Sequence, residues 1–585
     1  MIASSFDKGP EEMTRVSGDT FYSLYGTDIR FSRHGQIAIE AAAIIDAGGE
    51  LLVKRIVADD ATLDNIVFLA TLSSSTTQAT DDEGNLLYLD SEGNQTTTET
   101  EEIVVDSTST SIKWSAVSIE NCYTYDEVVE QAEALLDTDA GVYPLIVIVD
   151  NGRGDTGKAV RIYAANEVST TLNKTFYTLS TYEGTTRTDT TTVTINSTVY
   201  DGKNYGLDEY SMTQIKGHSS QAIYSQFIQA LADSLGITAE EADMIDIVSC
   251  LSYKGVAVDG LTLDADSIDL TVDYGVELSG GDNGEFGISP ANTDAWTDAL
   301  LEFYNGEYSN EIYELDEQKV CFIPDANLPY TVKEAIAALV TFREDCVFLR
   351  DTCLDVTSYA TAVAAMENFE TNNKFITNYC SWYQIYDPYD YRRIKVTMLY
   401  DLVKCLVTVY NTGIHVPTAG IANGYILESP IEGTINFIPR ITPDVNEKQL
   451  MDDLRMNYAF FQNGQCVVQS LYTSQEAYTQ LSYMNNVLAI QEVVRSVRTA
   501  CPKKRYTFVD DGDFSEYAEH VQKILANFSS NFDTLNFIYT KDNIMSNQKI
   551  FYASIEFAFK DWAQSEIFDV YAIANTTAES AVEEE

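Results

Sequence analysis

The strongest constraint on the fold is an alternation of predicted helices and strands between residues 294 and 351. Helices are expected from Asp294 to Tyr304 and from Thr331 to Arg343, and each is followed by an expected strand, Gln318 to Pro324 and Cys346 to Asp351. Strands that alternate with helices in this way form a parallel or mixed sheet that the helices cover. This part of the chain is therefore expected to be an α/β unit.

A similar unit is expected at the start of the chain. Apolar residues at positions 21, 24 and 25 have helical spacing, and Ser17 or Asp19 can cap the short helix that they predict. The elements expected here, in order, are a turn at Gly9 and Pro10, the short helix ended by Gly26, a helix from Gln36 to Asp46 ended by Gly48 and Gly49, and a buried strand from Leu51 to Val57.

Residues 71 to 275 differ in composition from both units. They are rich in Thr, Ser, Asp and Glu, with dense runs at Thr96 to Glu102 and Asp189 to Thr194. Polar β-branched residues between Gly and Asn turns favour exposed strands, so a protruding β-rich insertion is expected. One helix, Ser225 to Leu235, is expected to interrupt it and to end at Gly236. For residues 75 to 110 the alternative is a flexible linker, because such a polar segment buries little apolar surface.

The insertion contains a match to the phosphate-binding template G-x-x-x-x-G-K, from Gly152 to Lys158. The apolar strand predicted from Tyr143 to Val149 precedes it, as the template requires. However, Ala159 stands where a Ser or Thr should bind magnesium, and Ala159 to Ala165 is predicted to be a strand. Without a helix whose N-terminus holds the phosphate, nucleotide binding is not expected.

The C-terminal part is expected to have an α+β arrangement. Its first stretch contains a strand from Cys380 closed by a turn at Asp387 and Pro388, a packed segment from Lys395 to Tyr410 that is either strand or helix, and a break from Gly413 to Gly420. The later elements expected are a hairpin from Asn457 to Tyr472 with its turn at Asn463 and Gly464, a helix from Gln475 to Thr499 capped by Thr473 or Ser474, a segment from Arg505 to Val509, a helix around Tyr517 to Asn527, and strands from Ile550 to Phe559 and from Ile567 to Ile573.

The net charge of −54, from 90 Asp and Glu against 36 Lys and Arg, excludes several classes of partner. Phosphate binding needs clustered Lys and Arg, so neither nucleic acid nor an anionic membrane is expected to bind. No apolar run approaches the roughly 20 residues of a membrane-spanning helix, and residues 1 to 20 lack the layout of a signal peptide. With 585 residues, of which 45% are hydrophobic, the chain is expected to form three or four globular domains.

No catalytic, cofactor or metal site is predicted. The nine cysteines include no C-x-x-C pair and are expected to be reduced, mostly buried thiols of a cytoplasm-like compartment. The four histidines have neither the setting of a catalytic base nor the spacing of a helical metal pair. Asp510 to Asp513 lacks the spaced ligands of a calcium loop and is expected to be a solvated turn.

Two widely separated stretches resemble the contractile tail sheath proteins of bacteriophages. One is the start of the chain, with the pattern GP…V.S…F…YG…GG…VKRI, and the other is the strand, packed segment and Pro/Gly break between Tyr379 and Tyr425. A glycine-rich loop after Val276 and the C-terminal motifs YMNN and IEFAF are also similar to sheath sequences. The turn and strand residues of these motifs are Gly9, Pro10, Gly26, Gly48, Gly49, Gly280, Gly281, Gly284, Trp382, Pro388, Pro417 and Gly420.

The resemblance implies a division of the chain into four parts. Residues 1–70 would form the N-terminal part of a sheath core, 71–275 the insertion in one or two subdomains, 276–440 the α/β part of the core, and 441–585 a C-terminal α+β domain with an acidic tail. Sheath proteins usually carry an extended arm before the first motif, whereas the Gly9-Pro10 turn lies close to the start of this sequence. Either the arm is absent or the sequence starts late.

The resemblance also implies a function and a set of partners. Copies would stack as hexameric rings around a tail tube protein, between baseplate and tail terminator proteins, and would contract to drive the tube through the host envelope. The chain would be part of a virion that assembles in the host cytoplasm. Strands exchanged between copies would link the rings; the candidates are the first residues and the strand Ile567, Phe568, Asp569, Val570, Tyr571, Ala572 and Ile573.

No cofactor is implied, although divalent cations could offset the repulsion between acidic copies. Three alternatives remain open. The chain could be the sheath of a headless injection particle or bacteriocin, or an acidic, Thr-rich surface adhesin or layer protein. A phosphate-loop enzyme is the third and the least supported, for the reasons given above.

Overall fold

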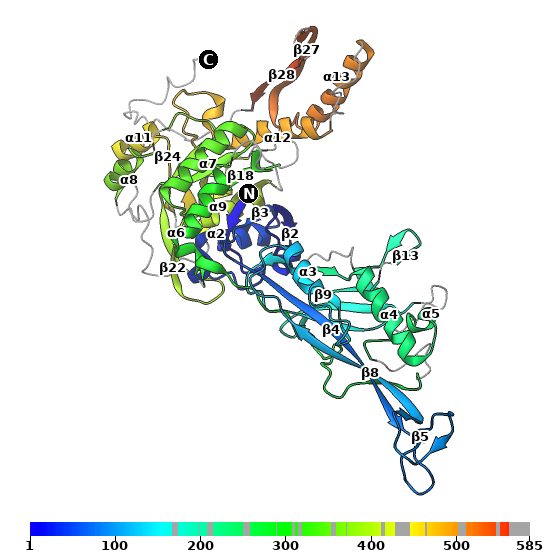
Figure 1. Cartoon of the computed structure of the whole chain (residues 1–585). Helices are drawn as coiled ribbons and strands as arrows, with labels where there is room; N and C mark the ends of the chain where they lie inside the picture. Colours follow the sequence, from blue (N-terminus) through cyan, green and yellow to red (C-terminus); the bar gives the residue numbers. More distant parts are fainter. Residues whose placement is uncertain are drawn as a thin grey trace, which may run out of the picture.

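The computed structural model describes residues 1–165, 174–196, 198–207, 214–249, 258–287, 289–306, 311–313, 319–352, 358–369, 371–410, 416–427, 445–462, 465–500, 511–545 and 550–560. The described residues form an elongated molecule, with a β-rich part projecting from a core of helices and sheets (Figure 1). The predicted multidomain mixture of α/β and α+β structure with a protruding insertion is therefore confirmed.

The N-terminal unit consists of a small mixed sheet and two helices. β1 is parallel and β2 antiparallel to the central strand β3. Gly35, with a φ of 73°, interrupts α2, so that the regular part of this helix begins at Gln36 as predicted. The elements are β1 (Ile2–Ser4), β2 (Thr14–Ser17), α1 (Asp19–Tyr25), α2 (Phe31–Asp46) and β3 (Glu50–Arg55).

The start of α1 differs from the prediction. Gly18 precedes the helix, and no side chain accepts a hydrogen bond from its first turn. The expected cap at Ser17 or Asp19 is wrong, because Ser17 belongs to β2 and Asp19 is already the first helical residue. Gly26 follows the helix, as predicted.

The α/β unit predicted between residues 294 and 351 is confirmed, and it extends further along the chain. Four parallel strands lie in the order β18-β19-β20-β24. The amino group of Met1 donates a hydrogen bond to the carbonyl of Phe322, 2.9 Å away, so β1 connects the N-terminal sheet to this one. The elements are α6 (Asp294–Tyr304), β18 (Phe322–Pro324), α7 (Tyr330–Arg343), β19 (Val347–Asp351), α8 (Tyr359–Met366), β20 (Ile376–Tyr379), α11 (Val445–Asp453) and β24 (Met456–Asn457).

The ambiguous segment from Lys395 to Tyr410 divides into a strand and a helix. Its first residues belong to β22, which forms a hairpin with β21, and the rest forms α9. Buried residues recur along α9 at helical spacing, from Leu399 to Val407. The elements are β21 (Trp382–Tyr386), β22 (Arg393–Thr397), α9 (Leu399–Tyr410), α10 (Gly420–Asn423) and β23 (Tyr425–Leu427).

One hydrophobic core joins the N-terminal unit to the parallel sheet. It includes Phe21 and Val53 from the first unit together with Phe348 and Leu402 from the second. The helix α2 contacts β1, β3 and α9, which places it between the two. The first residues of the chain are one of the two segments expected to link copies. They are part of this core, because β1 is buried against β3 of its own chain.

The insertion has a separate core between two sheets. A five-stranded sheet in the order β15-β9-β4-β8-β16 faces a four-stranded sheet in the order β12-β11-β10-β17. Trp114 is fully buried in this core and its indole donates a hydrogen bond to the carbonyl of Ile247, 2.8 Å away. The core draws on residues 66 to 278, while the domain limits at residues 70 and 275 stay a prediction.

The insertion contains more helix than predicted. The expected helix is α4, which ends at Gly236 as predicted, but α3 and α5 were not foreseen. Each has a capping box, Thr124 with Glu127 and Thr238 with Glu241, a signal that is visible in the sequence. The elements are β4 (Leu63–Gln78), β8 (Val105–Val117), α3 (Tyr125–Glu133), β9 (Val142–Arg153), β10 (Lys158–Ala164), β11 (Tyr177–Glu183), β12 (Thr186–Val193), β13 (Val199–Tyr200), β14 (Lys203–Asn204), β15 (Ile215–His218), α4 (Gln221–Leu235), α5 (Ala239–Ala242), β16 (Leu261–Leu263) and β17 (Val276–Glu277).

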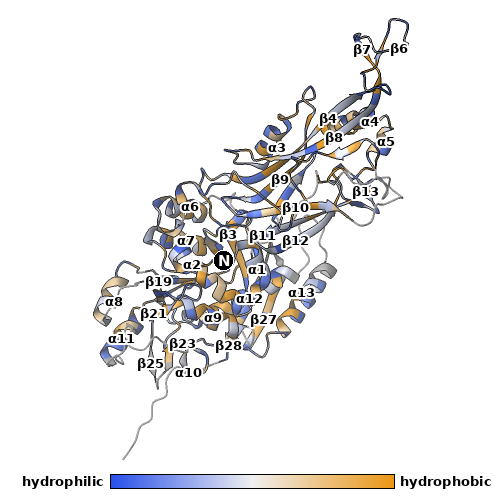
Figure 2. Cartoon of the chain, turned by 90° about the horizontal axis from the view of Figure 1, so that it is seen from below, coloured by the Kyte–Doolittle hydropathy of each residue, from blue (hydrophilic) through white to orange (hydrophobic). Residues whose placement is uncertain are grey.

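A long two-stranded ribbon extends the five-stranded sheet away from the core. β4 and β8 stay paired as far as Gln78 and Val105, through a series of Ser and Thr pairs. Residues 79–104, named the tip below, close the ribbon with the small sheet β6-β5-β7. Both views place the tip at the end of the molecule opposite α8 and α11 (Figures 1 and 2). Strands therefore form where a flexible linker was the alternative; the tip strands are β5 (Tyr88–Leu89), β6 (Gln95–Thr96) and β7 (Glu102–Ile103).

The C-terminal part has the predicted hairpin but a shorter helix. β25 and β26 pair antiparallel as expected, while their turn lies outside the described residues. The predicted helix from Gln475 is wrong over its first residues, because Thr473 and Ser474 donate backbone hydrogen bonds to Ser482 and Ile376 and fold this segment into a loop. The elements are β25 (Ala459–Gln462), β26 (Gln465–Val468), α12 (Met484–Ala500), α13 (Asp511–Ala526), β27 (Phe532–Met545) and β28 (Ile550–Phe559).

β28 matches the prediction, but its partner β27 was not foreseen. The predicted segments Arg505 to Val509 and Ile567 to Ile573 and the acidic tail lie outside the described residues. Short 3₁₀ helices also occur in the described chain, at Gly284–Phe286, Pro290–Asn292, Glu311–Tyr313 and Gln480–Ser482. In the part of the chain that the structure describes, no helix is long and apolar enough to cross a membrane.

Candidate assembly sites and the junction between core and insertion

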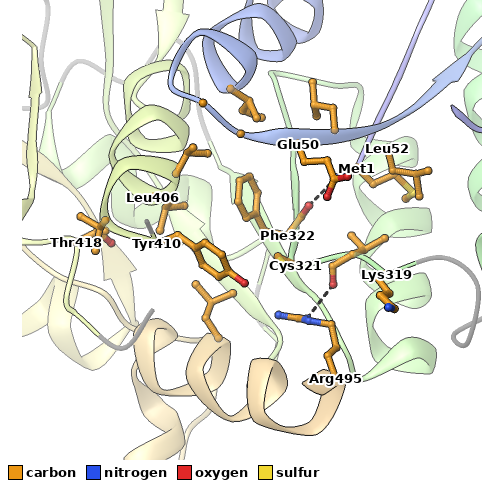
Figure 3. A pocket seen from close by; sticks show the side chains of 18 of the residues that line it. Met1, Glu50, Leu52, Lys319, Cys321, Phe322, Leu406, Tyr410, Thr418 and Arg495 are labelled. Carbon is orange, nitrogen blue, oxygen red and sulfur yellow. Dashed lines mark hydrogen bonds between the residues drawn. The ribbon is translucent and has the colours of Figure 1, made fainter. Parts of the chain in front are cut away.

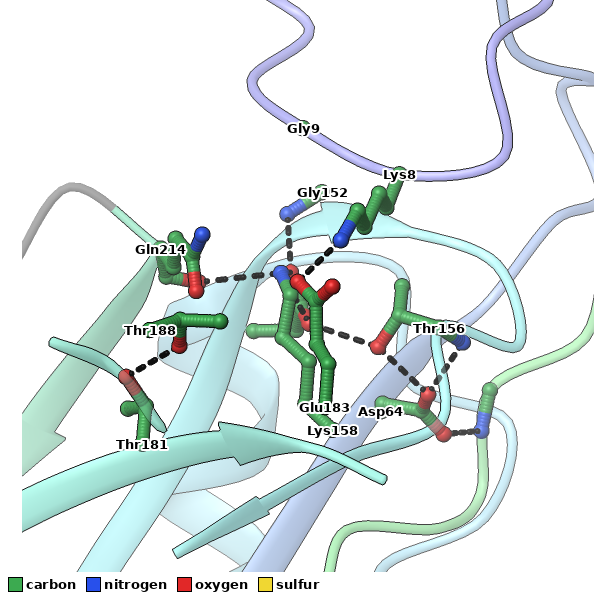
Figure 4. A network of polar contacts seen from close by, with 12 residues as sticks. Lys8, Gly9, Asp64, Gly152, Thr156, Lys158, Thr181, Glu183, Thr188 and Gln214 are labelled. Carbon is green, nitrogen blue, oxygen red and sulfur yellow. Dashed lines mark hydrogen bonds and ion pairs between the residues drawn. The ribbon is translucent and has the colours of Figure 1, made fainter. Parts of the chain in front are cut away.

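The phosphate-loop-like turn lies where the insertion joins the core (Figure 4). Lys158 is buried, and its ammonium group lies 2.7 Å from a carboxylate oxygen of Asp150 and donates to the carbonyl of Gln214. As predicted, a strand and not a helix follows the turn, although this strand, β10, begins at Lys158 and not at Ala159. The charge of the lysine is therefore balanced by Asp150 inside the protein, and the turn has none of the helix-terminal N–H groups that hold a phosphate.

Asp64 joins this turn to the glycine-rich loop at Gly280 and Gly281. Its carboxylate accepts a hydrogen bond from the backbone N–H of Thr156, 2.7 Å away, and another from the N–H of Gly281, 2.9 Å away. Burial raises the pKa of Asp64, although these hydrogen bonds oppose the shift. A β-carbon on Gly281 would lie 2.4 Å from the carbonyl oxygen of Gly154, so the close approach of two loops explains this glycine.

The N-terminal turn packs on the same junction through Arg55. The buried guanidinium of Arg55 donates hydrogen bonds to the carbonyls of Phe6, Asp7 and Gly9 from the N-terminal turn and to that of Arg153 from β9. A β-carbon on Gly152 would lie 2.2 Å from the carbonyl oxygen of Gly9. The first glycine of the phosphate-loop pattern is thus explained by backbone packing.

Two ion pairs add to this contact. Arg153 lies 2.8 Å from Glu11, and Lys8 forms an ion pair with Glu183 of β11. Burial alone would raise the pKa of Glu11, but the hydrogen bonds and the charge of Arg153 outweigh it, so that the pKa is lowered. The N-terminal turn is consequently bonded to both sheets of the insertion.

The predicted motif residues are spread over the core and are not brought together in one site. They lie in the N-terminal turn (Gly9, Pro10), after α1 (Gly26), after α2 (Gly48, Gly49), at the junction (Gly280, Gly281, Gly284), in the β21–β22 hairpin (Trp382, Pro388) and around the start of α10 (Pro417, Gly420). The strand from Ile567 to Ile573 is outside the described residues. The role of the motif residues as turns shared with sheath proteins remains a prediction.

The residues that organise the junction were not predicted. Arg55, Asp64 and Asp150 are charged residues in the strands β3, β4 and β9, and neither Asp64 nor Asp150 belongs to a recognised sequence motif. Glu11 and Arg153 are 142 residues apart in the sequence. No local spacing signals such contacts, because only the fold brings the partners together.

A cavity of about 270 Å³ lies between α2, α9, α12 and the strand β18 (Figure 3). Its wall is mostly apolar, with Leu52, Phe322 and Leu406 among its residues. The guanidinium of Arg495 lies at one side, where it donates to the carbonyls of Val320 and Asp345 and pairs with Glu492. Its charge is thus balanced within the protein.

The C-terminal hairpin β27–β28 is an open sheet. In the described part of the chain, each strand pairs only with the other, over most of their length. Helices α12 and α13 pack on it around Val493, Val521 and Phe532. Two-stranded sheets are marginally stable alone, and open edges are sites for adding strands. This sheet is therefore a candidate assembly site.

No group of three or more His, Cys, Asp or Glu residues that could hold a metal occurs among the described residues. The three histidines that are described lie apart: His34 contacts Asp7, His218 contacts Glu133, and His520 is in α13. The six described cysteines form no disulfide with one another, and four of them are buried.

No protein-family model and no curated protein sequence matches the chain. Solved structures with some similarity include the sheath tail protein of Desulfitobacterium hafniense, with 8% identity and a TM-score of 0.40 over 93% of this chain and 88% of that one. A sheath complex of the PVC extracellular contractile injection system, in its contracted state, has 14% identity and a TM-score of 0.36 over 47% of this chain and 79% of that one.

A chain of the baseplate of the anti-feeding prophage (AFP) has 11% identity and a TM-score of 0.33; the match covers 42% of this chain and 66% of that one. These structural neighbours are thus a sheath tail protein, a sheath complex and a chain of a baseplate. Because every TM-score is under 0.5, the function of this chain has to follow from its own residues and geometry.

Proposed function

We propose that this chain is the structural subunit of a contractile tail sheath. The open-edged sheet β27–β28 is the observation that carries the proposal, together with the two sheath-like stretches of sequence. A subunit with an open sheet edge and a strand to donate can join head to tail with further copies, and such a heterologous contact generates a ring or a helical filament. The strand from Ile567 to Ile573 is the proposed donor.

In the proposed assembly, hexameric rings stack around a tail tube protein between baseplate and terminator proteins. Contraction rearranges contacts between copies and drives the tube through the host envelope. The subunit acts without a cofactor and without catalysis. The particle is either a phage tail, assembled in the host cytoplasm as part of a virion, or a headless injection particle, and neighbouring genes for a capsid would distinguish the two.

Negative-stain electron microscopy of the purified chain tests the proposal. Hollow, striated cylinders of uniform width are expected. Deleting residues 561–585 should abolish them, because the donor strand is lost. Ile538 of β27 is 41% exposed, and Ile538→Asp should weaken assembly because it places a charge on the accepting sheet.

Val199→Asp is the matched control. Val199 is 67% exposed on the separate hairpin β13–β14, so the same change of charge there should leave the cylinders intact. Monomers in every condition, including added tube protein, would contradict the proposal and favour the adhesin alternative.

A further inference from the structure

The tip is strongly acidic and contains two hydrogen-bonded turns. Residues 79–104 contain eight Asp and Glu and no Lys or Arg. Two turns of the same pattern, D-x-E-G-N, start at Asp81 and Asp90, and in each the Asp carboxylate accepts hydrogen bonds from backbone N–H groups two and four residues later. The ion pairs among the described residues include none of the tip carboxylates, so this charge is uncompensated.

An apolar stripe lies on one face of the same tip. Tyr88 of β5 pairs with Ile103 of β7. Leu86, which bridges to Thr80, lies two residues before Tyr88, and Val105, the first residue of β8, lies two residues after Ile103. Residues two apart on a strand share a face, so these four side chains form one stripe. Leu86, Ile103 and Val105 are 47%, 38% and 49% exposed, which is unusual for aliphatic residues that the fold places side by side.

The β21–β22 hairpin has the opposite character. Its exposed residues include Tyr386, Tyr391, Arg392 and Arg393, and the side chain of Arg392 is 76% exposed. Of the acids of this hairpin, Asp387 is buried and accepts a hydrogen bond from the N–H of Phe31. The side chain of Asp390 is 15% exposed and lies 3.6 Å from the guanidinium of Arg392, so Arg393 is the exposed arginine of the hairpin without such an ion pair among the described residues. In a chain with a net charge of −54, the hairpin thus presents cations and aromatic rings to solvent.

We propose that the tip of one copy docks on the β21–β22 hairpin of a neighbouring copy. The carboxylates of the tip face Arg392 and Arg393, and the apolar stripe packs on Tyr386 and Tyr391. The contact combines complementary charge at the rim with aromatic and aliphatic burial at the centre, which is the usual composition of a protein interface.

The two surfaces cannot meet within one chain. The tip lies at the far end of the projecting insertion, whereas the hairpin lies on the core (Figure 1). A contact between different patches of identical copies is heterologous and propagates along a ring or filament. The inference therefore rests on the proposed function and adds to it a second contact, distinct from strand exchange at β27–β28.

A photo-cross-linking experiment on the full chain tests the contact. Tyr391 is replaced by p-benzoylphenylalanine in one population, which is mixed with a heavy-isotope-labelled population of the unmodified chain. Irradiation should join position 391 of one population to residues 79–105 of the other, as mass spectrometry of the linked peptides shows. The pair Arg392→Glu and Arg393→Glu should reduce the yield about tenfold, because like charges then oppose each other.

Reversing the charges on both surfaces tests the contact more directly than removing them from one. Placing Glu83→Lys and Glu92→Lys in the labelled population should recover the cross-link with the Arg392→Glu and Arg393→Glu chain. Leu86→Ser with Val105→Ser should also lower the yield. The matched controls are Val199→Ser and the pair Arg187→Glu and Lys203→Glu, exposed residues elsewhere on the insertion that should leave the yield unchanged.

The outcomes separate this contact from the proposed function. Cylinders whose cross-links from position 391 map outside residues 79–105 would overturn the docking and leave the sheath proposal intact. The expected cross-link in small oligomers that never form cylinders would support the docking and count against a sheath. If neither the cylinders nor the cross-link form, both the sheath proposal and the docking are overturned.

Discussion

At Gly152 the backbone of the insertion passes so close to the N-terminal turn that a β-carbon would lie 2.2 Å from the carbonyl oxygen of Gly9 and 2.6 Å from the guanidinium of Arg55. Carbon and oxygen atoms that are not bonded cannot approach this closely. One of the two backbones would have to move, and the four carbonyl hydrogen bonds of Arg55 oppose that movement.

We expect Gly152→Ala to destabilise the protein by about 3 kcal/mol or more, since overpacking of a rigid site costs about 1–3 kcal/mol and this site is bounded by backbone. Gly157→Ala is the matched control. Its β-carbon would meet nothing within 4 Å, so only its positive φ of 61° should cost stability, about 1–2 kcal/mol. Calorimetric unfolding should show the larger shift for Gly152→Ala; equal shifts would contradict the packing explanation.

Glu40 is a second residue whose environment predicts a measurable effect. It is buried in α2, and burial raises its pKa from an ordinary 4.5 to about 8. The hydrogen bond from Gln36 opposes this shift, while the charges of Asp325 and Asp351 add to it. Between these two pH values the folded chain keeps a proton on Glu40 that the unfolded chain has released. Stability must therefore fall as the pH rises from 4.5 to 8.

Glu40→Gln should remove this pH dependence. At pH 9 the variant should be more stable than the parent chain, by an amount on the order of a few kcal/mol because each pKa unit corresponds to about 1.4 kcal/mol. Near pH 4.5 the two should differ little. Thermal unfolding across this pH range provides the measurement, with Glu302→Gln, a change at an exposed position of α6, as the control. Parallel curves for the parent and Glu40→Gln would contradict the prediction.

At the scale of elements, the strand β10 decides what the turn before it can do. Lys158 is the first residue of this strand, and its ammonium group is enclosed by Asp150 and the carbonyl of Gln214. A helix in the same place would have directed backbone N–H groups toward the turn. The antiparallel pairing of β10 with β11 and β17 instead makes Lys158 a buried structural residue.

Lys158→Met should therefore destabilise the insertion by about 3–5 kcal/mol, because it leaves the carboxylate of Asp150 buried without its partner. Adding Asp150→Asn removes that charge and should recover part of the loss. Limited proteolysis measures the stability of both variants, when the rate of cleavage in the insertion is compared with the rate in the core. Nucleotide binding by the parent chain that Lys158→Met abolishes would instead support the phosphate-loop reading.

At the scale of the whole molecule, net charge limits how closely copies can pack. A charge of −54 on each subunit makes neighbouring copies repel, and salt screens this repulsion over about 10 Å at 0.1 M. The repulsion acts over the whole surface, whereas the proposed contacts at β27–β28 and at the tip are local.

Cylinders of the proposed sheath should accordingly become more stable when salt or divalent cations are added. Sedimentation at increasing temperature, in a chelator at low salt and in magnesium or calcium, measures the difference. Monovalent salt at equal ionic strength is the control, and it separates screening from specific cation binding. Equal stability in the chelator at low salt would count against this view of the assembly.

Local patterns were sufficient to determine much of the secondary structure. The helix ended by Gly26, the helix after Gly35, the elements between Asp294 and Asp351, and the strand at Ile550–Phe559 all follow from spacing and turn residues within a few positions. The argument against a phosphate loop was also local, since it depended on Ala159 in the place of a Ser or Thr and on the strand predicted from Ala159 to Ala165. These features are short-range because propensity and turn geometry act between near neighbours.

The tertiary structure alone decided which distant residues meet. The loop from Thr473 to Ser482 replaces a predicted helical turn because Ser474 bonds to Ile376, about 100 residues earlier. The Arg55 and Asp64 networks, the apolar stripe of the tip and its separation from the β21–β22 hairpin likewise depend on contacts that the fold creates. Burial and charge pairing act through space, so a sequence read along its length cannot reveal them.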